Sequence, residues 1–549
     1  MGRGARVNPP RTQARWAGIA YVVVTFLSFP HPVAVLPGGV LDLGIGLSWF
    51  SPAFLFLAIE GLTPRKALWR GLMLGMVSNA AILHWAYVVT VDYGNADPLL
   101  GLLAPPGMAL YTTVFVGAFA AGTAYLRQRG LGRIFVLAAL WVAIDHLRGW
   151  ILGGFPWATI GYAQHLNRFL LGIVTLTGVY GLSFVVALGG AAIAEFVRSR
   201  RFDFEMRAAV ACIVLLHGLG PFLYADEIPA DAETVRIGAV QGNVSQDAKW
   251  MRERFNETLA DYERGTLEAA VQGAQLVVWP ESAMTRPVQL DRGLRSRLSM
   301  LARDSGAALV VGSVGTEVDA RGAVSDYFDS AFTIAPDGGW LTRYDKTHLV
   351  PFGEYLPLRD WIGRIAQAVA TGIAKGDVTP GARPFAVDLP LASPSSVDAV
   401  AHRSVRAGIP ICYELLFPDL VRRFVEDDAG VLLAITNDAW YGRTGAPYQF
   451  LAMTALRSAE SGVWTVRAAN TGVTAVIDGR GRVRERTEIF EPAVLVADVP
   501  IRPRGFEPTF YVRYGDVFAG ACSLAAFAAL VIAWRRRADA RPEEAQASR

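Results

Sequence analysis

One thiol, one carboxylate and one ammonium stand at the ends of strand-like segments in the polar part of the chain. Cys412 follows the buried-strand pattern of residues 405–411, and Glu281 and Lys346 close the runs 277–280 and 344–345. A carboxylate can accept the proton of a thiol, and an ammonium can stabilise a thiolate or the oxyanion of a tetrahedral intermediate. Together these residue types predict acyl transfer through a cysteine. The backbone N–H of Tyr413, just after the thiol, could complete the oxyanion site.

Each of the three residues also has an ordinary structural interpretation. A cysteine at a strand end is often a small core residue, Glu281 could begin a helix, and Lys346 could lie on the surface. The number and placement of the cysteines favour a reactive role for Cys412. The other two cysteines, Cys212 and Cys522, lie in apolar runs, so Cys412 has no evident disulfide partner. Outside the cell membrane, where thiols oxidise, an unpaired cysteine is a liability unless it reacts.

The composition predicts a membrane protein with an added polar domain. Of the 549 residues, 52% are hydrophobic and only 18% are charged, which is too apolar for an ordinary soluble protein. A spanning helix needs about 20 mostly apolar residues. The first of eight candidate spans could instead be a signal peptide, and the second, broken by glycines and Pro52, could be partly re-entrant. The candidate spans are roughly 16–30, 37–62, 69–91, 98–126, 134–153, 168–197, 206–225 and 514–534.

Five clusters of basic residues fix the predicted topology. With eight spans all five fall on one side, which the positive-inside rule makes the cytoplasm. The polar segment 226–513 then lies on the opposite face. Because the arginines are grouped by topology and the net charge is only +3, no nucleic-acid partner is indicated. The clusters are Arg3, Arg6, Arg11 and Arg15; Arg65, Lys66 and Arg70; Arg127, Arg129 and Arg133; Arg198, Arg200, Arg201 and Arg207; and Arg535, Arg536 and Arg537.

The polar segment alternates short β-branched strands with helices, which predicts a layered α/β domain. Residues 354–384 lack a strand pattern and could form a lid, dip into lipid or pack as a surface helix. The seven histidines are scattered without ligand spacing, so neither a metal nor an organic cofactor is expected. The predicted strands are 234–243, 274–282, 307–315, 329–336, 405–414, 429–437 and 473–478, and the predicted helices are 249–271, 291–304, 416–428 and 446–462.

Arg148 lies in an unusual loop at the outer end of a predicted span. The loop runs from Asp145 to Trp157 and combines charged groups with a Gly/Pro/Trp turn. One interpretation is an aromatic interfacial anchor with a snorkelling arginine. The other is a contact between Arg148 and a lipid headgroup or phosphate.

Four motifs resemble the nitrilase (carbon–nitrogen hydrolase) superfamily, which implies an α-β-β-α sandwich with a Glu-Lys-Cys triad. They are Trp279-Pro-Glu-Ser282, residues 346–355, Pro410-Ile-Cys-Tyr-Glu414 and Asn437-Asp-Ala-Trp-Tyr-Gly442. With the spans on both sides and the motif of residues 148–164, nearly the whole chain resembles the apolipoprotein N-acyltransferase family of bacterial inner membranes. The resemblance implies a nucleophile (Cys412), a general base and acid (Glu281), an oxyanion stabiliser (Lys346), supporting residues (Glu354, Tyr413 and Glu414) and a substrate-side tryptophan (Trp250).

Three positions depart from the family pattern. Asp329 stands where asparagine is frequent, Val463 where a basic residue is common, and Asp145 where a longer acid is usual. None of them belongs to the triad, so they bear on substrate positioning and not on the reaction class.

The resemblance implies two half-reactions. Cys412 takes an acyl chain from the sn-1 ester of a phospholipid, phosphatidylethanolamine, and the α-amine of a lipoprotein's N-terminal diacylglyceryl-cysteine then accepts it. We expect a monomer in the bacterial inner membrane. Its N-terminal transmembrane helices would be residues 1–225, its periplasmic nitrilase-like catalytic domain 226–513, and its last span and cytoplasmic tail 514–549.

Two other functions fit parts of the sequence. A membrane-anchored nitrilase-type amidase would act on a small carbon–nitrogen substrate and would turn over soluble amides without phospholipid. A transporter-like or scaffold membrane protein with an inactive domain would leave Cys412 unreactive towards thiol reagents.

Overall fold

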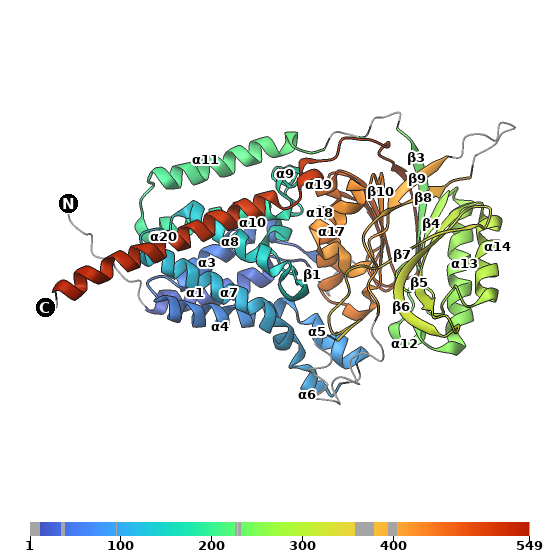
Figure 1. Cartoon of the computed structure of the whole chain (residues 1–549), viewed down its shortest axis with the longest axis horizontal. Helices are drawn as coiled ribbons and strands as arrows, with labels where there is room; N and C mark the ends of the chain where they lie inside the picture. The colour runs from blue at the N-terminus through green and yellow to red at the C-terminus, as the bar shows by residue number, and fades with distance from the viewer. Residues whose placement is uncertain are drawn as a thin grey trace. The chain divides into compact units, whose positions relative to one another are not determined.

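The apolar and polar parts of the sequence fold into two compact units (Figure 1). The computed structural model describes residues 11–33, 39–94, 96–225, 228, 232–356, 378–392 and 403–547. The helical unit comprises Met1–Tyr224, Thr444–Ala452 and Tyr514–Arg549. The α/β unit comprises Ala225–Arg443 and Met453–Arg513.

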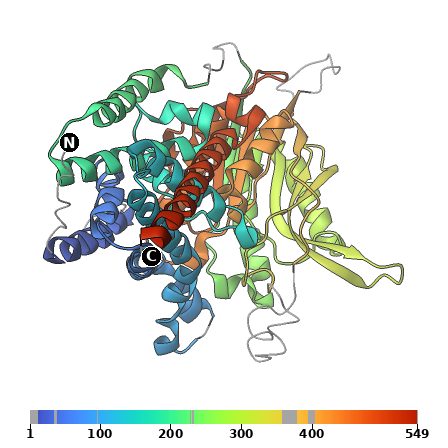
Figure 2. The same cartoon turned by 60° about the vertical axis from the view of Figure 1, so that its left-hand side comes forward.

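Long apolar helices build the helical unit, and α20 runs beside α8 and α10 (Figures 1 and 2). Small residues let two of these helices approach closely: a Cβ atom added to Gly71 of α4 would lie 2.7 Å from the Cβ atom of Ala120 on α7. The main helices are α1 (Arg11–Leu27), α3 (Phe50–Ala58), α4 (Pro64–Ile82), α7 (Ala104–Gln128), α8 (Ile134–Arg148), α10 (Val179–Ser199), α11 (Phe204–Leu219) and α20 (Val517–Ala547).

The structure confirms several apolar helices but not the number of eight spans. Within the described residues, four helices are long and apolar enough to cross a membrane: Pro98–Gln128, Val179–Ser199, Phe204–Phe222 and Val517–Arg536. A fifth is counted if Pro64–Ile82 and Trp85–Tyr93, bent by 60°, form one span. The expected windows contained helix breaks that hydropathy does not detect. One example is Gly178, whose φ of 60° precedes the start of α10.

Two six-stranded sheets form the centre of the α/β unit, in the orders β14-β3-β4-β5-β6-β7 and β13-β12-β11-β10-β9-β8. The pairs β3–β4, β4–β5, β9–β10 and β10–β11 are parallel, and the other pairs are antiparallel. The strands are β3 (Thr234–Gln241), β4 (Leu276–Val278), β5 (Ala308–Val318), β6 (Val324–Ile334), β7 (Trp340–Asp345), β8 (Ala386–Pro390), β9 (Ser404–Gly408), β10 (Val431–Thr436), β11 (Trp464–Ala469), β12 (Ala475–Ile477), β13 (Val483–Arg486) and β14 (Ala493–Pro500).

Helices cover the outer faces of both sheets, which gives an α-β-β-α sandwich (Figure 1). Helices α13 (Phe255–Val271) and α14 (Arg292–Ser305) pack on the first sheet through a core that includes Trp279, Leu298 and Leu309. Helix α17 (Pro418–Glu426) packs on the second sheet, where Gly408 lets the ring of Phe424 approach the strand, and so does the part of α18 (Ala446–Ser461) that lies in the α/β unit. The predicted layered α/β domain is confirmed.

The same end of several strands supplies the predicted chemistry. Glu281 follows β4, Lys346 follows β7, and Cys412 lies four residues after β9. The carboxyl ends of parallel strands meet at one edge of a sheet. Glu281 and Lys346 follow strands of the first sheet and Cys412 follows a strand of the second, so the cluster is built from both sheets.

Candidate active site

The structure brings Glu281, Lys346 and Cys412 together. Lys346 Nζ donates a hydrogen bond to Glu281 Oε1 at 2.9 Å, and the Cys412 thiol lies near enough for the charge of the same carboxylate to raise its pKa. Lys346 is fully buried, and Glu281 and Cys412 are only 6% and 7% exposed. The three predicted groups therefore form one enclosed cluster inside the α/β unit.

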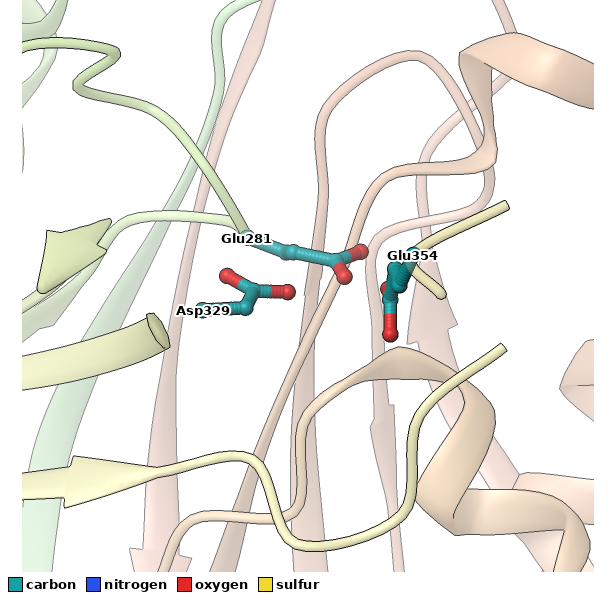
Figure 3. A group of neighbouring side chains, drawn as sticks. All are labelled: Glu281, Asp329 and Glu354. Carbon is teal, nitrogen blue, oxygen red and sulfur yellow. The ribbon is translucent and has the colours of Figure 1, made fainter. Parts of the chain in front are cut away.

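Three carboxyl groups surround the Lys346 ammonium. Besides Glu281, Nζ lies 2.5 Å from Glu354 Oε1 and 3.4 Å from Asp329 Oδ2. Figure 3 shows the three carboxyl groups gathered at one place, each from a different part of the chain. Such a group of acids resembles a cation site, and the cation that they share in this structure is the lysine ammonium.

Cys412 occupies a tight turn. Its φ of 46° lies in the left-handed region, which non-glycine residues adopt only when their surroundings enforce it. Ile411 pairs with Ile435 in an isolated parallel bridge, and a short 3-10 helix, η7, begins at the cysteine (Cys412–Leu416). The strained turn thus fixes where the sulfur points.

Glu414 ties the cysteine turn to the segment that carries the lysine. Its Oε2 accepts the backbone N–H of Ile411 at 2.8 Å, and its Oε1 accepts the backbone N–H of Thr347 at 2.7 Å. The hydroxyls of Thr347 and Tyr344 donate to the same oxygen, each at 2.7 Å. This buried carboxylate therefore holds the nucleophile and Lys346 in a fixed relation.

The other two predicted supporting residues, Tyr413 and Glu354, have separate places around the triad. The ring of Tyr413 packs among aromatic neighbours: it stacks on His348, with centroids 5.7 Å apart, and meets Phe417 edge-on at 5.2 Å. Glu354 accepts the backbone N–H of Val350 at 2.9 Å in addition to the lysine. The tyrosine side chain thus supports the turn, and Glu354 supports the lysine.

The local charges favour a thiol beside a carboxylate in the resting site. Burial would raise the pKa of Glu281, but the Lys346 ammonium and hydrogen bonds from neighbouring groups outweigh it and lower that pKa to about 2. Burial, with the Glu281 charge, raises the pKa of the Cys412 thiol well above its usual value. The proton therefore rests on sulfur until a substrate is attacked.

Among the described residues, two further groups contact Glu281: Lys249, which no quoted motif contains, and Asn437, which begins a quoted motif but had no predicted role. Lys249 is buried, and its Nζ donates to the backbone carbonyl of Glu281 at 3.0 Å. The backbone N–H of Asn437, just after β10, donates to Glu281 Oε2 at 2.8 Å. The rarity of lysine could have identified Lys249 from the sequence. The chain has four lysines among 52 basic residues, and two of them, Lys249 and Lys346, lie at the triad.

The two predicted substrate contacts lie away from the triad's hydrogen bonds. Trp250 follows the short helix α12 (Gln246–Lys249) and is 56% exposed. Arg148 is buried in the helical unit, where it pairs with Asp145 at 3.1 Å and donates to Thr159 Oγ1 at 2.8 Å. The contact of Arg148 with a headgroup stays a prediction, as does the contact of Trp250 with substrate.

Two other expectations concern the predicted arm and Val463. Most of the arm, residues 357–377, lies outside the described residues. Val463 is fully buried just before β11. At that position a basic side chain would have no solvent to reach, so the chain's valine suits its surroundings.

Comparison with known proteins matches two family domains along the chain. Residues 17–192 match the apolipoprotein N-acyltransferase N-terminal domain, and residues 236–503 match the carbon–nitrogen hydrolase domain. Among solved structures, an amidase from Nesterenkonia sp. is similar at a TM-score of 0.36 and 20% identity, covering 54% of this chain and 98% of the amidase chain.

Curated relatives extend the match over nearly the full length. An apolipoprotein N-acyltransferase of Geobacter metallireducens is 36% identical over 527 residues, which cover 94% of each chain. One of Azotobacter vinelandii is 34% identical and covers 90% of this chain and 91% of the relative. The chain therefore belongs to the apolipoprotein N-acyltransferase family, acyltransferases within the carbon–nitrogen hydrolase superfamily.

Proposed function

We propose that the protein moves an acyl chain from a membrane phospholipid to the α-amine of a lipoprotein's N-terminal diacylglyceryl-cysteine, through a thioester on Cys412. The observation that carries the chemistry is the position of one carboxylate, Glu281, which accepts the Lys346 ammonium at 2.9 Å and whose charge acts on the buried Cys412 thiol. Family membership supplies the two substrates.

In the first half-reaction, Glu281 accepts the thiol proton as the sulfur of Cys412 attacks the ester carbonyl. The C–O bond then breaks, and Glu281 returns the proton to the departing lysophospholipid oxygen. Because the thiol pKa is high and the Glu281 pKa is low, proton transfer accompanies attack and does not precede it. A thioester remains on the enzyme.

In the second half-reaction, the amine attacks the thioester carbonyl. Glu281 takes a proton from the attacking nitrogen, the C–S bond breaks, and the sulfur of Cys412 recovers a proton from Glu281. In both steps the carbonyl oxygen becomes negative, and the Lys346 ammonium and the Tyr413 N–H are the proposed stabilisers of that charge. Glu354 holds Lys346 in place for this task.

We place the catalytic domain, residues 226–513, on the periplasmic side of the bacterial inner membrane. The supports are the five basic clusters and the charge rule, which require eight spans within 1–225 and 514–549. A monomer using phosphatidylethanolamine as donor is the simplest form of the proposal. Tethering to spans suits a reaction in which both substrates are lipids.

Intact mass spectrometry tests the proposal. After incubation with phospholipid, wild-type protein should gain the mass of one acyl chain, and a diacylglyceryl-cysteine peptide should remove it. Cys412→Ala should gain nothing. The double variant Cys212→Ser/Cys522→Ser is the matched control and should acylate like wild type, because both residues lie in apolar helices of the helical unit.

Two results would contradict the proposal. Acylation lost in the stably expressed double variant would mean that the thiol chemistry lies elsewhere. No adduct on wild type, with Cys412 still open to alkylation, would favour hydrolysis of a small amide instead.

A further inference from the structure

The carboxyl groups around Lys346 do not share hydrogen-bond donors evenly. Glu281 receives the lysine ammonium on one oxygen and the Asn437 N–H on the other, at 2.9 and 2.8 Å. Glu354 likewise receives the ammonium and the Val350 N–H, at 2.5 and 2.9 Å. Both oxygens of each group are thus satisfied, as an ionised carboxylate requires.

Asp329 is different. On β6, its Oδ2 has only the long 3.4 Å contact with Lys346, and its Oδ1 is buried without an N–H or hydroxyl donor among the described residues. One carboxyl oxygen of Asp329 and one of Glu281 lie within 4.8 Å of each other. Two carboxyl groups can form a hydrogen bond only when one of them carries a proton.

The charges around Asp329 are balanced when one of the neighbouring carboxyl groups carries a proton. Asp329 faces Glu281 after β4, Glu354 in the loop after β7, and the ammoniums of Lys346 and Lys249, with the neutral Cys412 thiol close by. Within the part of the chain that the structure describes, three ionised acids would leave one negative charge unpaired beside two cations in a buried site. Burial and the Glu281 charge raise the pKa of Asp329 well above its usual range.

We propose that Asp329 is a neutral acid in the resting enzyme and donates its proton as a hydrogen bond to Glu281, so that it acts as a positioning residue for the reaction's base. The inference rests on the proposed role of Glu281 but not on the identity of the acyl donor or acceptor. A third N–H or O–H donor keeps Glu281 ionised and its carboxylate aimed at Cys412. It also removes a negative charge from beside the developing oxyanion.

Asparagine and alanine are therefore different substitutes at this position. The amide introduced by Asp329→Asn matches a protonated carboxyl group in shape and can donate a hydrogen bond, so this variant should keep the geometry. Asp329→Ala removes the donor and leaves Glu281 less stabilised as an anion. The first variant is the conservative one, although it changes an acid to an amide.

Infrared difference spectroscopy of the full-length protein in detergent reads the proton directly. At about pH 7, where an ordinary aspartate is ionised, wild type should show the C=O stretch of a protonated carboxyl group. Asp329→Asn should lose that band, and Glu354→Gln should keep it. A band that disappears in Glu354→Gln and survives in Asp329→Asn, or no band in wild type, would overturn the proposal.

This measurement needs no substrate, so it can fail or succeed independently of the acyl-transfer function. Single-turnover thioester formation supplies the second test. Asp329→Asn should stay within about threefold of wild type, and Asp329→Ala should be slower by about 10- to 100-fold. In a plot of this rate against pH, the fall on the acid side should also move to higher pH in Asp329→Ala, because the Glu281 pKa rises. Equal loss in both variants, with unchanged melting temperatures, would refute the assignment.

Discussion

At the residue scale, lysine and not arginine supplies the positive charges described at the active site. The chain carries 48 arginines and only four lysines, yet among the described residues the triad's own cation, Lys346, and the cation beside it, Lys249, are both lysines. Arginine is a planar fork that stays charged, whereas lysine is a compact point charge whose pKa responds to burial. The pKa of Lys346 is raised well above its usual value despite burial, because the Glu281 and Glu354 carboxylates lie beside it. The two lysines therefore differ in how firmly they hold charge.

Lys249 should act as a titratable part of the site. Burial lowers its pKa to about 8, although the charge of the Glu281 carboxylate opposes the shift. The ammonium is present below that pH and is lost above it, so thioester formation by wild type should slow as pH rises through about 8. Below that pH, Lys249→Met should form the thioester about tenfold more slowly than wild type, or roughly 1.4 kcal/mol in activation free energy. Its rate should not decrease as pH rises through about 8.

Single-turnover rates with phospholipid alone measure this effect, because they exclude titration of the acceptor amine. Lys249→Arg is the matched control, since it keeps a charge that does not titrate in this range. Parallel pH profiles for wild type and Lys249→Met would show that Lys249 serves structure only.

At the element scale, one carboxylate connects two strand ends. Glu414 bonds the turn before Cys412 and the residue after Lys346, so the ends of β9 and β7 move as one body. The connection crosses between the two sheets, because β9 and β7 belong to different ones. Catalysis depends on such fixed relations, since small displacements of reacting groups cost large factors in rate.

Glu414→Gln should loosen that connection. All four groups that reach Glu414 are donors, so the glutamine NH₂ must face at least one backbone N–H. Leaving a buried donor unpaired costs about 1–3 kcal/mol of stability. The rate of thioester formation should fall as well, because Cys412 and Lys346 are no longer held in a fixed relation. Thermal unfolding and single-turnover rates check this. Tyr344→Phe, which removes one of the four bonds without a donor clash, should be milder, and equal effects would contradict the explanation.

The sequence predicted the elements better than their pairing. Buried β-branched runs indicated β3, β4, β5, β9 and β10, and strand ends located Glu281 and Lys346. Strand β13, with all four residues exposed, carries no apolar signal and was not expected. The contact of Asp329 with Lys346 was also out of reach, because it depends on the register of β6 against β7 and on the course of the chain after β7. Hydropathy likewise located apolar stretches without locating helix breaks.

At the scale of the whole molecule, the chain joins an apolar helical unit to a polar catalytic unit. Most of the helical unit precedes the catalytic segment, and α20 follows it near the C-terminus. Thus both ends of the α/β segment are covalently attached to apolar helices. Such attachment keeps the thioester near lipid, where both proposed substrates are found, and limits the side of the membrane that the site can face.

That side can be measured by labelling single cysteines. In a background of Cys212→Ser, Cys522→Ser and Cys412→Ala, Ala320→Cys lies in the exposed turn between β5 and β6, and Arg201→Cys in the exposed basic segment before α11. An impermeant maleimide added to intact spheroplasts should label Ala320→Cys at once. It should reach Arg201→Cys only after lysis, because the positive-inside rule keeps basic loops in the cytoplasm. Labelling of Arg201→Cys alone before lysis would reverse the proposed topology, and labelling of both positions before lysis would contradict it. Either result would leave the periplasmic assignment without support.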